Sequence, residues 1–314
     1  MINPLQPFID AQGVVLLDGA LATELERRGA DLNDPLWSAK ILLESPDLIR
    51  DVHREYFDAG ADVATTASYQ ATFEGLARRG LSESEAADLI RLSVELAQEA
   101  RAEFWAKEAT REGRLRPIIA GSVGSYGAYL ADGSEYSGDY GLSRDELIAF
   151  HRPRIEVLAD AGIDILACET IPSLHEAEAL AALLAEFPGL PAWVSFSCRD
   201  ESHVGEGAPL VDCAAVLQRC NNVVAIGINC TPPRYIGGLV NALAGVTDKA
   251  ILTYPTSGET WNAKTRSWSE HPGPPDFLEA ARVWYEAGAR GIGGCCRTTP
   301  QTIRRLSGSL RSRA

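Results

Sequence analysis

Residues 161–197, AGIDILACETIPSLHEAEALAALLAEFPGLPAWVSFS, contain the unit that decides the fold. A short apolar run, Ile163–Glu169, is followed by Ser173–Glu186, where apolar residues recur at the three- and four-residue spacing of a helix. A second apolar run, Ala192–Ser197, follows after a short loop. Ala161-Gly162 precedes the first run, and glycine there supplies the left-handed cap that turns a helix back into a strand. The unit is therefore strand, helix, strand.

The same unit recurs along the whole chain. We expect eight strands, at Val14–Asp18, Ala61–Thr66, Pro117–Ser122, Ile163–Glu169, Ala192–Ser197, Val223–Asn229, Ala250–Tyr254 and Gly291–Gly294. We expect helices at Pro46–Ala59, Ser82–Ala106, Ser143–Ala161, Ser173–Glu186, Leu210–Cys220, Arg234–Ala244, Pro275–Ala287 and Pro300–Gly308. Strict alternation indicates a parallel α/β sheet, and eight units in this length predict a closed (β/α)₈ TIM barrel.

An open doubly wound sheet is the alternative fold. It would need fewer strands and, in a nucleotide-binding protein, a glycine-rich first turn. The first turn here is Asp18-Gly19-Ala20, which is not Gly-x-Gly-x-x-Gly, and no linker marks a second domain. We therefore expect residues 1–314 to form a single barrel domain.

Composition restricts the possible partners. The net charge of −14 argues against nucleic acid and anionic membranes. No stretch approaches about 18 consecutive apolar residues, and the N-terminus lacks a basic region followed by an apolar core. Seven cysteines, an odd number, favour a reducing compartment over a disulfide framework. We expect a cytoplasmic protein with small-molecule substrates, present as a monomer or small homo-oligomer.

Three cysteines lie at the ends of two predicted strands, in GINC at 227–230 and GGCC at 293–296. Only the seventh strand separates these strands, so Cys230, Cys295 and Cys296 can meet at the carboxyl-terminal face, where barrel enzymes carry their active sites. Three thiolates favour Zn²⁺ and leave the fourth tetrahedral position open, as in a catalytic site. We expect one zinc per chain, with the glycines before Cys295 providing the backbone freedom to turn both neighbouring cysteines toward it.

The competing interpretation is that cysteines here are small buried hydrophobic residues. It is preferred for the other four cysteines, which are Cys168, Cys198, Cys213 and Cys220. A disulfide between the adjacent Cys295 and Cys296 is sterically awkward and disfavoured in a reducing compartment. The sequence has five histidines and no obvious Ser/His/Asp arrangement, so no catalytic residue is expected beyond the metal site.

Six motifs make the sequence recognisable. They are LLDGA at 16–20, TASYQAT at 66–72, GSVGSYGAYLADGSEY at 121–136, CET at 168–170, GINC at 227–230 and GGCCRTTP at 293–300. Together they span nearly the whole chain, and the last two are highly specific. With these motifs the chain resembles the homocysteine S-methyltransferases, most closely the short enzymes that use S-methylmethionine.

The resemblance implies roles for individual residues. The three cysteines would hold zinc, with the homocysteine sulfur in the fourth position. Asp18 and Glu169 would bind the homocysteine ammonium, with Gly19 near its carboxylate; by position alone, Asp18 could equally cap a helix and Glu169 could form a salt bridge. The remaining candidates for the substrate pocket are Thr66, Tyr69, Gln70 and Asn229.

The implied reaction is zinc-dependent methyl transfer from a sulfonium donor to the thiolate of L-homocysteine, giving methionine. A sulfonium leaves as a neutral thioether, so no general acid is needed. S-methylmethionine, S-adenosylmethionine and betaine are the candidate donors, and the resemblance favours the first. A non-catalytic zinc or thiol-sensing barrel is the alternative from another class; it would keep the cysteines and need neither Asp18 nor Glu169.

Two loops are candidate walls for the donor. The loop Val123–Gly141 contains Tyr126, Tyr129, Tyr136 and Tyr140, whose ring faces can attract a cation. The alternative is a surface loop whose tyrosines only pack. Ser257–Pro275, with Trp261 and Trp268, is the second candidate.

Overall fold

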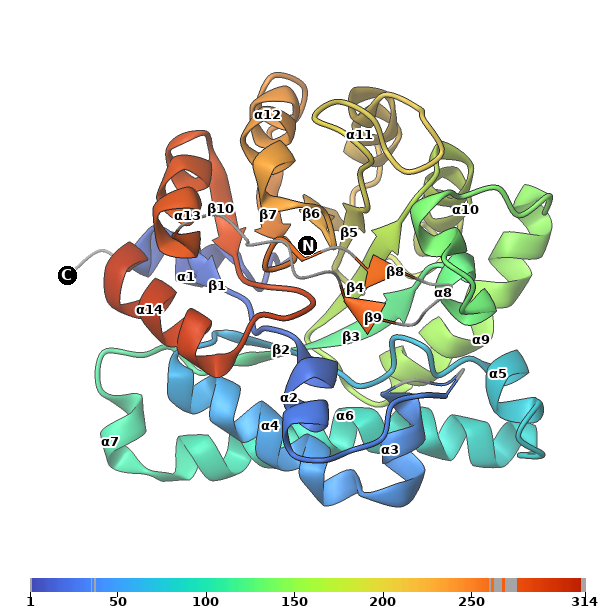
Figure 1. Cartoon of the computed structure of the whole chain (residues 1–314), viewed down its shortest axis with the longest axis horizontal. Coiled ribbons are helices and arrows are strands. Elements are labelled where there is room, and N and C mark those ends of the chain that lie inside the picture. The colour runs from blue at the N-terminus through green and yellow to red at the C-terminus, as the bar shows by residue number, and fades with distance from the viewer. Residues whose placement is uncertain are drawn as a thin grey trace.

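The computed structural model describes residues 2–34, 36, 38–259, 261–262, 267–268 and 276–311. Eight parallel strands form one sheet in the order β1-β10-β7-β6-β5-β4-β3-β2. The sheet closes on itself, because Leu17 forms a parallel bridge with Val63 and the Asp62 amide donates to the Leu16 carbonyl at 2.7 Å. The predicted single α/β barrel is therefore confirmed (Figure 1).

The strands lie where the alternating pattern predicted them, with shifted ends. They are β1 (Val15–Leu16), β2 (Val63–Thr65), β3 (Ile118–Gly124), β4 (Ile165–Ile171), β5 (Ala192–Phe196), β6 (Val223–Asn229), β7 (Ala250–Tyr254) and β10 (Ala289–Ile292). The last barrel strand, expected at Gly291–Gly294, begins and ends two residues earlier. Gly293 and Gly294 instead begin the loop that carries two of the cysteines. A short antiparallel pair, β8 (Trp261–Asn262) and β9 (Ser267–Trp268), follows β7.

Helices surround the barrel, as Figure 1 shows. The eight predicted helices correspond to α4 (Pro46–Ala59), α6 (Glu83–Ala106), α9 (Arg144–Asp160), α10 (Leu174–Leu184), α11 (Leu210–Gln218), α12 (Pro233–Ala244), α13 (Phe277–Glu286) and α14 (Pro300–Leu310). Capping boxes at Ser82/Glu85 and Ser143/Glu146 begin α6 and α9. Gly60, Gly162 and Gly288 have positive φ before the next strands, as the left-handed cap requires.

Seven further short helical segments in the described part of the chain were not predicted. They are α1 (Gln6–Gln12), α2 (Leu21–Arg27), α3 (Ala39–Glu44), α5 (Phe73–Ala77), α7 (Glu108–Arg111), α8 (Tyr126–Leu130) and the 3₁₀ helix η1 (Ser134–Tyr136). Leu5 and Phe8 at α1 join the hydrophobic cluster that fills the barrel interior. The segments α2, α8 and η1 follow β1 and β3, so they lie at the carboxyl-terminal face, where they help to form the site described below.

Two hydrophobic clusters hold this architecture. The larger lies between the sheet and the helices, and the smaller fills the barrel with residues that include Val15, Ile165 and the fully buried Trp193. Above this plug the inward-facing residues become polar, which places the functional site at the barrel mouth.

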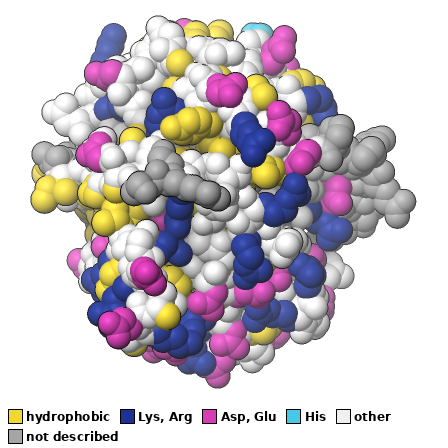
Figure 2. Space-filling view, turned by 90° about the vertical axis from the view of Figure 1, so that its left-hand side faces the viewer, with side chains coloured by type: hydrophobic (Ala, Val, Ile, Leu, Met, Phe, Trp, Pro, Cys, Tyr) yellow, Lys and Arg dark blue, Asp and Glu magenta, His cyan; other side chains and the backbone are white. Residues whose placement is uncertain are grey.

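The outer surface is chemically mixed where α13 and α14 lie. Figure 2 shows both acidic and basic side chains on this face. Within the described residues, no helix combines the length and the apolar character needed to cross a membrane.

Candidate active site and metal centre

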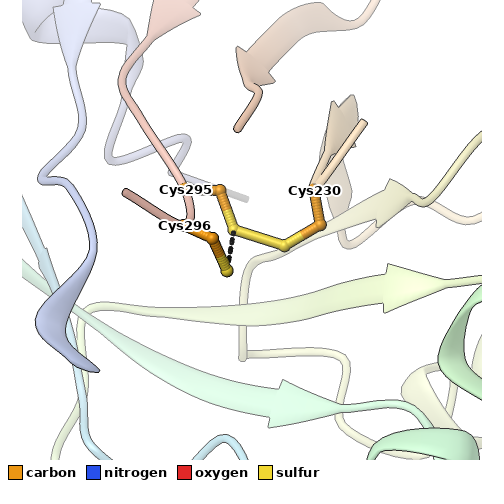
Figure 3. A group of neighbouring side chains, drawn as sticks. All are labelled: Cys230, Cys295 and Cys296. Atoms are coloured by element: carbon orange, nitrogen blue, oxygen red, sulfur yellow. Dashed lines mark hydrogen bonds between the residues drawn. A yellow bond between two sulfur atoms is a disulfide. The ribbon is translucent and has the colours of Figure 1, made fainter. Parts of the chain in front are cut away.

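Three cysteines meet at the barrel mouth (Figure 3). Cys230 directly follows β6, while Cys295 and Cys296 lie in the loop after β10, and β7 separates the two strands as predicted. Their three sulfur atoms lie within 4.8 Å of one another. Cys230 and Cys295 are joined as a disulfide, and the Sγ of Cys296 lies 3.9 Å from that of Cys295. The sequence prediction that these three side chains converge is confirmed.

The backbone that aims the cysteines differs from the expected one. We expected unusual backbone angles at Gly293 and Gly294, but neither has positive φ; Cys230 (φ 47°) and Arg297 (φ 68°) do. Glycine is needed at 293 for close packing instead, because a Cβ there would lie 2.6 Å from the Cβ of Leu17. The sequence indicated a glycine-dependent loop correctly and gave the wrong reason for it.

Hydrogen bonds hold the cysteine loop in place. The Cys295 amide donates to the Pro255 carbonyl at 2.8 Å, and the Cys295 carbonyl accepts from the Thr298 hydroxyl at 2.7 Å. The Arg297 amide donates to the Thr23 hydroxyl at 3.0 Å. The loop is thereby tied both to the end of β7 and to α2, which fixes the positions of its sulfur atoms.

The donor set fits a soft metal ion. Burial raises the pKa of the Cys296 thiol to about 12, so the thiolate needs a cation beside it. Three thiolates at one point are the ligands that zinc and other thiophilic metals prefer. The disulfide and the three-thiolate site use the same sulfur atoms, so they are mutually exclusive states of this cluster.

Two buried carboxylates lie near the cysteines. Asp18 is 6% exposed and accepts hydrogen bonds from the Thr65 amide at 2.8 Å and the Thr65 hydroxyl at 3.0 Å. Glu169, on β4, is 8% exposed and accepts from the hydroxyls of Ser122 and Tyr254. Asp18 does not cap a helix, because Ala20 is the N-cap residue of α2. Glu169 forms no salt bridge within the described residues.

The electrostatics of these carboxylates is unusual. Burial raises the pKa of Asp18 to about 8, and the nearby Glu169 charge adds to the rise. Burial likewise raises the pKa of Glu169 to about 7. In the part of the chain that the structure describes, their partners are hydroxyls and an amide, with no cation among them. Two buried acids without a counter-charge form a site that a ligand cation would complete.

The other predicted pocket residues differ in how they are engaged. The Thr66 hydroxyl accepts from the Ser122 amide at 3.0 Å, and Asn229 forms two hydrogen bonds with Thr170, at 2.8 and 2.9 Å. Gln70 donates to the Ala128 carbonyl at 2.8 Å. These contacts join neighbouring strand ends and loops.

The predicted site residues line one cavity of about 560 Å³. It brings together the predicted residues Asp18, Gly19, Thr66, Tyr69, Gln70, Glu169, Asn229, Cys230, Cys295 and Cys296. Ten residues chosen from strand ends thus share one space, and the cysteine cluster forms part of its wall.

The tyrosine loop is only partly a wall of this cavity. We expected an unstructured loop, but it contains α8 and η1. Tyr126, Tyr129 and Tyr140 form a ring cluster with Phe150 and do not line the cavity, whereas Tyr136 does. For the first three, the packing alternative is correct. The side chains of Trp261 and Trp268 lie outside the described residues.

Sequence reasoning missed several wall residues. They are chiefly Thr65, Ser122, Glu135 and Tyr254. Ser122 and Tyr254 end their predicted strands, so strand-end position was a usable signal for both. The Tyr254 hydroxyl also accepts from Trp193 Nε1 at 3.0 Å, which connects Glu169 to the barrel plug. Glu135 lies in a loop motif and gave no such signal.

Comparisons with known proteins agree with this geometry. A sequence model of homocysteine S-methyltransferase matches residues 15–310. The chain is 55% identical over 311 residues to homocysteine S-methyltransferase YbgG of Bacillus subtilis, covering 99% of each protein. It is 50% identical to selenocysteine Se-methyltransferase of Brassica oleracea, covering 96% of this chain and 90% of that protein.

A solved structure shares the fold. The metallated form of the homocysteine methyltransferase MmuM from Escherichia coli superposes with a TM-score of 0.88 at 49% identity, covering 98% of this chain and 99% of that one. An oxidized form of the same protein matches equally well. The family match over nearly the whole chain and the close relatives lead to one conclusion: the chain belongs to the homocysteine S-methyltransferase family.

Proposed function

We propose that this enzyme transfers a methyl group from a sulfonium donor to the thiolate of L-homocysteine, that it depends on zinc, and that S-methylmethionine is its preferred donor. The observation that carries the proposal is the shared cavity. Three cysteine sulfurs within 4.8 Å of one another and two buried carboxylates without a counter-cation line the same 560 Å³ space. A substrate with a thiol at one end and an ammonium at the other matches both features.

In this proposal Cys230, Cys295 and Cys296 hold one zinc ion per chain as thiolates. When bound, zinc supplies a positive charge that keeps a coordinated substrate thiol deprotonated and nucleophilic at neutral pH. The chain's contribution is to fix the three sulfurs through the loop contacts of Cys295 and Arg297, so that the acceptor sulfur has a single position.

Asp18 and Glu169 bind the homocysteine ammonium. Each carboxylate keeps its orientation through donors on a neighbouring strand, Thr65 for Asp18 and Ser122 for Glu169. The ammonium supplies the cation that both buried acids lack and should draw both toward ionisation. Gly19, Thr66, Tyr69, Gln70 and Asn229 complete the wall, and residues 1–314 act as one homocysteine-binding domain.

The donor assignment follows from charge and leaving group. A sulfonium carries a positive charge into a cavity rich in carboxylates and leaves as a neutral thioether, which needs no proton. S-adenosylmethionine shares this chemistry but brings a bulky adenosyl group, and betaine carries a less reactive quaternary ammonium. The family includes a selenocysteine Se-methyltransferase, so chalcogen acceptors other than homocysteine are to be tested as well.

The experiment is a donor comparison on purified, zinc-loaded enzyme. Loss of homocysteine thiol and formation of methionine are measured with S-methylmethionine, S-adenosylmethionine and betaine at saturating homocysteine. We expect the highest kcat/KM with S-methylmethionine and its loss after chelation, with recovery on adding Zn²⁺. A preference for betaine overturns the donor assignment, and unchanged activity after verified metal removal overturns the zinc dependence. Zinc binding without turnover by any donor would instead support the thiol-sensing alternative.

A further inference from the structure

The cavity contains three carboxylates beyond the two that hold the homocysteine ammonium. They are Glu26, Asp34 and Glu135. Asp34 forms an ion pair with Arg79. Burial raises the pKa of Glu26, and the nearby Arg297 charge lowers it. Within the described part of the chain, no ion pair is formed by Glu135. It is therefore the one of these three acids whose charge a ligand would have to balance.

One carboxylate oxygen of Glu135 forms no hydrogen bond within the described residues. This oxygen, Oε2, is buried. Burial raises the pKa of Glu135 to about 7. Hydrogen bonds from the backbone amides of Glu135 itself and of Gly133 oppose this rise. A buried carboxylate oxygen without a donor is unfavourable unless a ligand satisfies it.

The backbone around Glu135 is fixed rather than loose. Its carbonyl accepts from the Ser197 hydroxyl at 2.7 Å, at the end of β5. Gly127 of α8 packs so tightly against the Glu135 amide that a Cβ would not fit there, and a Cβ on Gly205 would lie 2.6 Å from the Tyr136 carbonyl. The turn that carries Glu135 into the cavity wall is therefore held rigidly.

Glu135 also lies close to the reacting centre. It lines the same cavity as Cys296, Tyr69 and Tyr136. A methyl donor must place its sulfonium on the outer side of the acceptor sulfur, in line with it. Glu135, with the ring of Tyr136 beside it, is placed to receive that charge.

We infer that Glu135 determines specificity for the methyl donor by pairing its free carboxylate oxygen with the donor's sulfonium charge. This inference rests on the proposed sulfonium chemistry. In the reaction, a lone pair of the homocysteine thiolate forms the new S–CH₃ bond while the donor C–S bond breaks and leaves its electron pair on the donor sulfur. The thiolate and sulfonium charges cancel, and the donor leaves as a neutral thioether.

The charge change predicts how Glu135 acts. Its attraction is strongest for the bound donor and fades as the sulfonium is neutralised, so it favours donor binding and product release rather than the transition state. Losing one partner of a desolvated charge pair should weaken donor binding roughly 30-fold, with kcat unchanged or raised. Methionine is one methyl group smaller than S-methylmethionine and carries no sulfonium charge, so its binding should change little.

The test compares these two ligands on full-length protein. Calorimetric titration measures the Kd of S-methylmethionine and of methionine for the wild type, Glu135→Gln, Glu135→Asp, Glu26→Gln and the control Glu95→Gln, which removes an exposed carboxylate on α6. We expect Glu135→Gln to lose the preference for S-methylmethionine while keeping methionine affinity within about threefold. Glu135→Asp, which retains the charge, should keep a preference even if the glutamine variant folds poorly.

Three results overturn the inference. Equal weakening of both ligands by Glu135→Gln indicates a structural role, an unchanged preference indicates no role, and loss of preference in Glu26→Gln alone moves the role to Glu26. Failure of the proposed function is distinguishable, because it is seen in the wild type. A wild type that neither binds nor turns over S-methylmethionine overturns both proposals. If the wild type is fully active and Glu135→Gln still prefers S-methylmethionine over methionine, only the role of Glu135 is overturned.

Discussion

The two ends of the barrel bury carboxylates in opposite ways. At the amino-terminal end, Asp62 is fully buried and accepts from Arg311 at 2.6 Å, Gln12 at 2.6 Å and the Leu16 amide at 2.9 Å, with Arg114 at 3.6 Å. At the mouth, Asp18 and Glu169 have comparable burial but only hydroxyl and amide partners. One end provides its own cations, and the other leaves them to be supplied.

The difference distinguishes a structural carboxylate from a binding one. Asp164 repeats the amino-terminal pattern, with Arg101 at 2.6 Å and the Ile119 amide at 2.7 Å. An acid completed by the protein contributes to the fold, and removing it leaves a buried charge unpaired. An acid without an internal cation weakens the ligand-free fold and gains its partner on binding. Mutations at the two ends should therefore separate stability from substrate affinity.

The largest effect is expected at the metal cluster of the mouth. Cys295→Ser should lose bound zinc and lower kcat/KM by roughly 10²-fold or more, because a free thiol is only a few per cent ionised near pH 7 and the acceptor sulfur loses its fixed position. The melting temperature of the metal-free proteins should barely differ. Metal analysis and steady-state assays measure both, with Cys220→Ser as the control. Full metal occupancy in the variant would contradict the site.

The next largest effect is on stability, at the opposite end. Asp62→Asn leaves Arg311 and Arg114 without their carboxylate, so the free energy of unfolding should fall by about 3–5 kcal/mol. Homocysteine affinity of the folded protein should stay unchanged. Urea unfolding and calorimetric titration give the two numbers. Glu186→Gln, which breaks an exposed pair with Arg152, is the control, and its unfolding free energy should barely change. A substrate-binding defect in Asp62→Asn would remove the contrast.

The third test makes the matching change at the mouth. Asp18→Asn and Glu169→Gln should each weaken homocysteine binding by about 2–5 kcal/mol, because the ammonium loses a buried partner. Unfolding free energy should stay constant or rise, since a buried, cation-free carboxylate is removed. Bound zinc should be retained. Wild-type homocysteine affinity in both variants would show that the substrate lies differently in the cavity.

The last prediction is a pH dependence with opposite signs for stability and binding. The folded-state pKa values of Asp18 (about 8) and Glu169 (about 7) lie above their unfolded values, so folding favours their protonated forms. Their contribution to stability is fully present below about pH 4 and is lost as the pH rises through 7–8. The ammonium needs ionised partners, so homocysteine binding should strengthen over that same rise. Unfolding and titration of wild type and Asp18→Asn from pH 5 to 8.5 measure this; an unchanged slope in the variant would exclude Asp18.

Much of this comparison is visible in the sequence, and part of it is not. Apolar runs and helix periodicity predicted all eight barrel strands, because strand burial in a parallel sheet depends on local composition. Strand-end position placed Cys230, Asp18 and Glu169 correctly. What local pattern could not provide was partner identity: that Asp62 meets Arg311, 249 residues away, follows from barrel closure.

The loops show the same limit. The glycines before Cys295 were predicted to matter, but the role of Gly293 depends on the close approach of Leu17, which directly follows the first strand, and that of Gly294 on Thr298. Among the four loop tyrosines, three belong to one ring cluster that includes Phe150 of α9 and one lines the cavity, and the sequence gives no signal that separates them. Contacts between segments far apart in the chain decide such cases.

The seam where the barrel closes has a consequence for its motions. β1 and β2 are the shortest barrel strands. Beyond the Leu17–Val63 bridge, the two segments are joined by the hydrogen bond from the Thr65 amide to the Asp18 carboxylate. The same carboxylate is the proposed partner of the substrate. Local opening at this seam and release of the amino acid would then be linked equilibria, so bound homocysteine should slow amide exchange of Thr65 in proportion to its saturation. The enzyme would be most tightly closed when it is occupied.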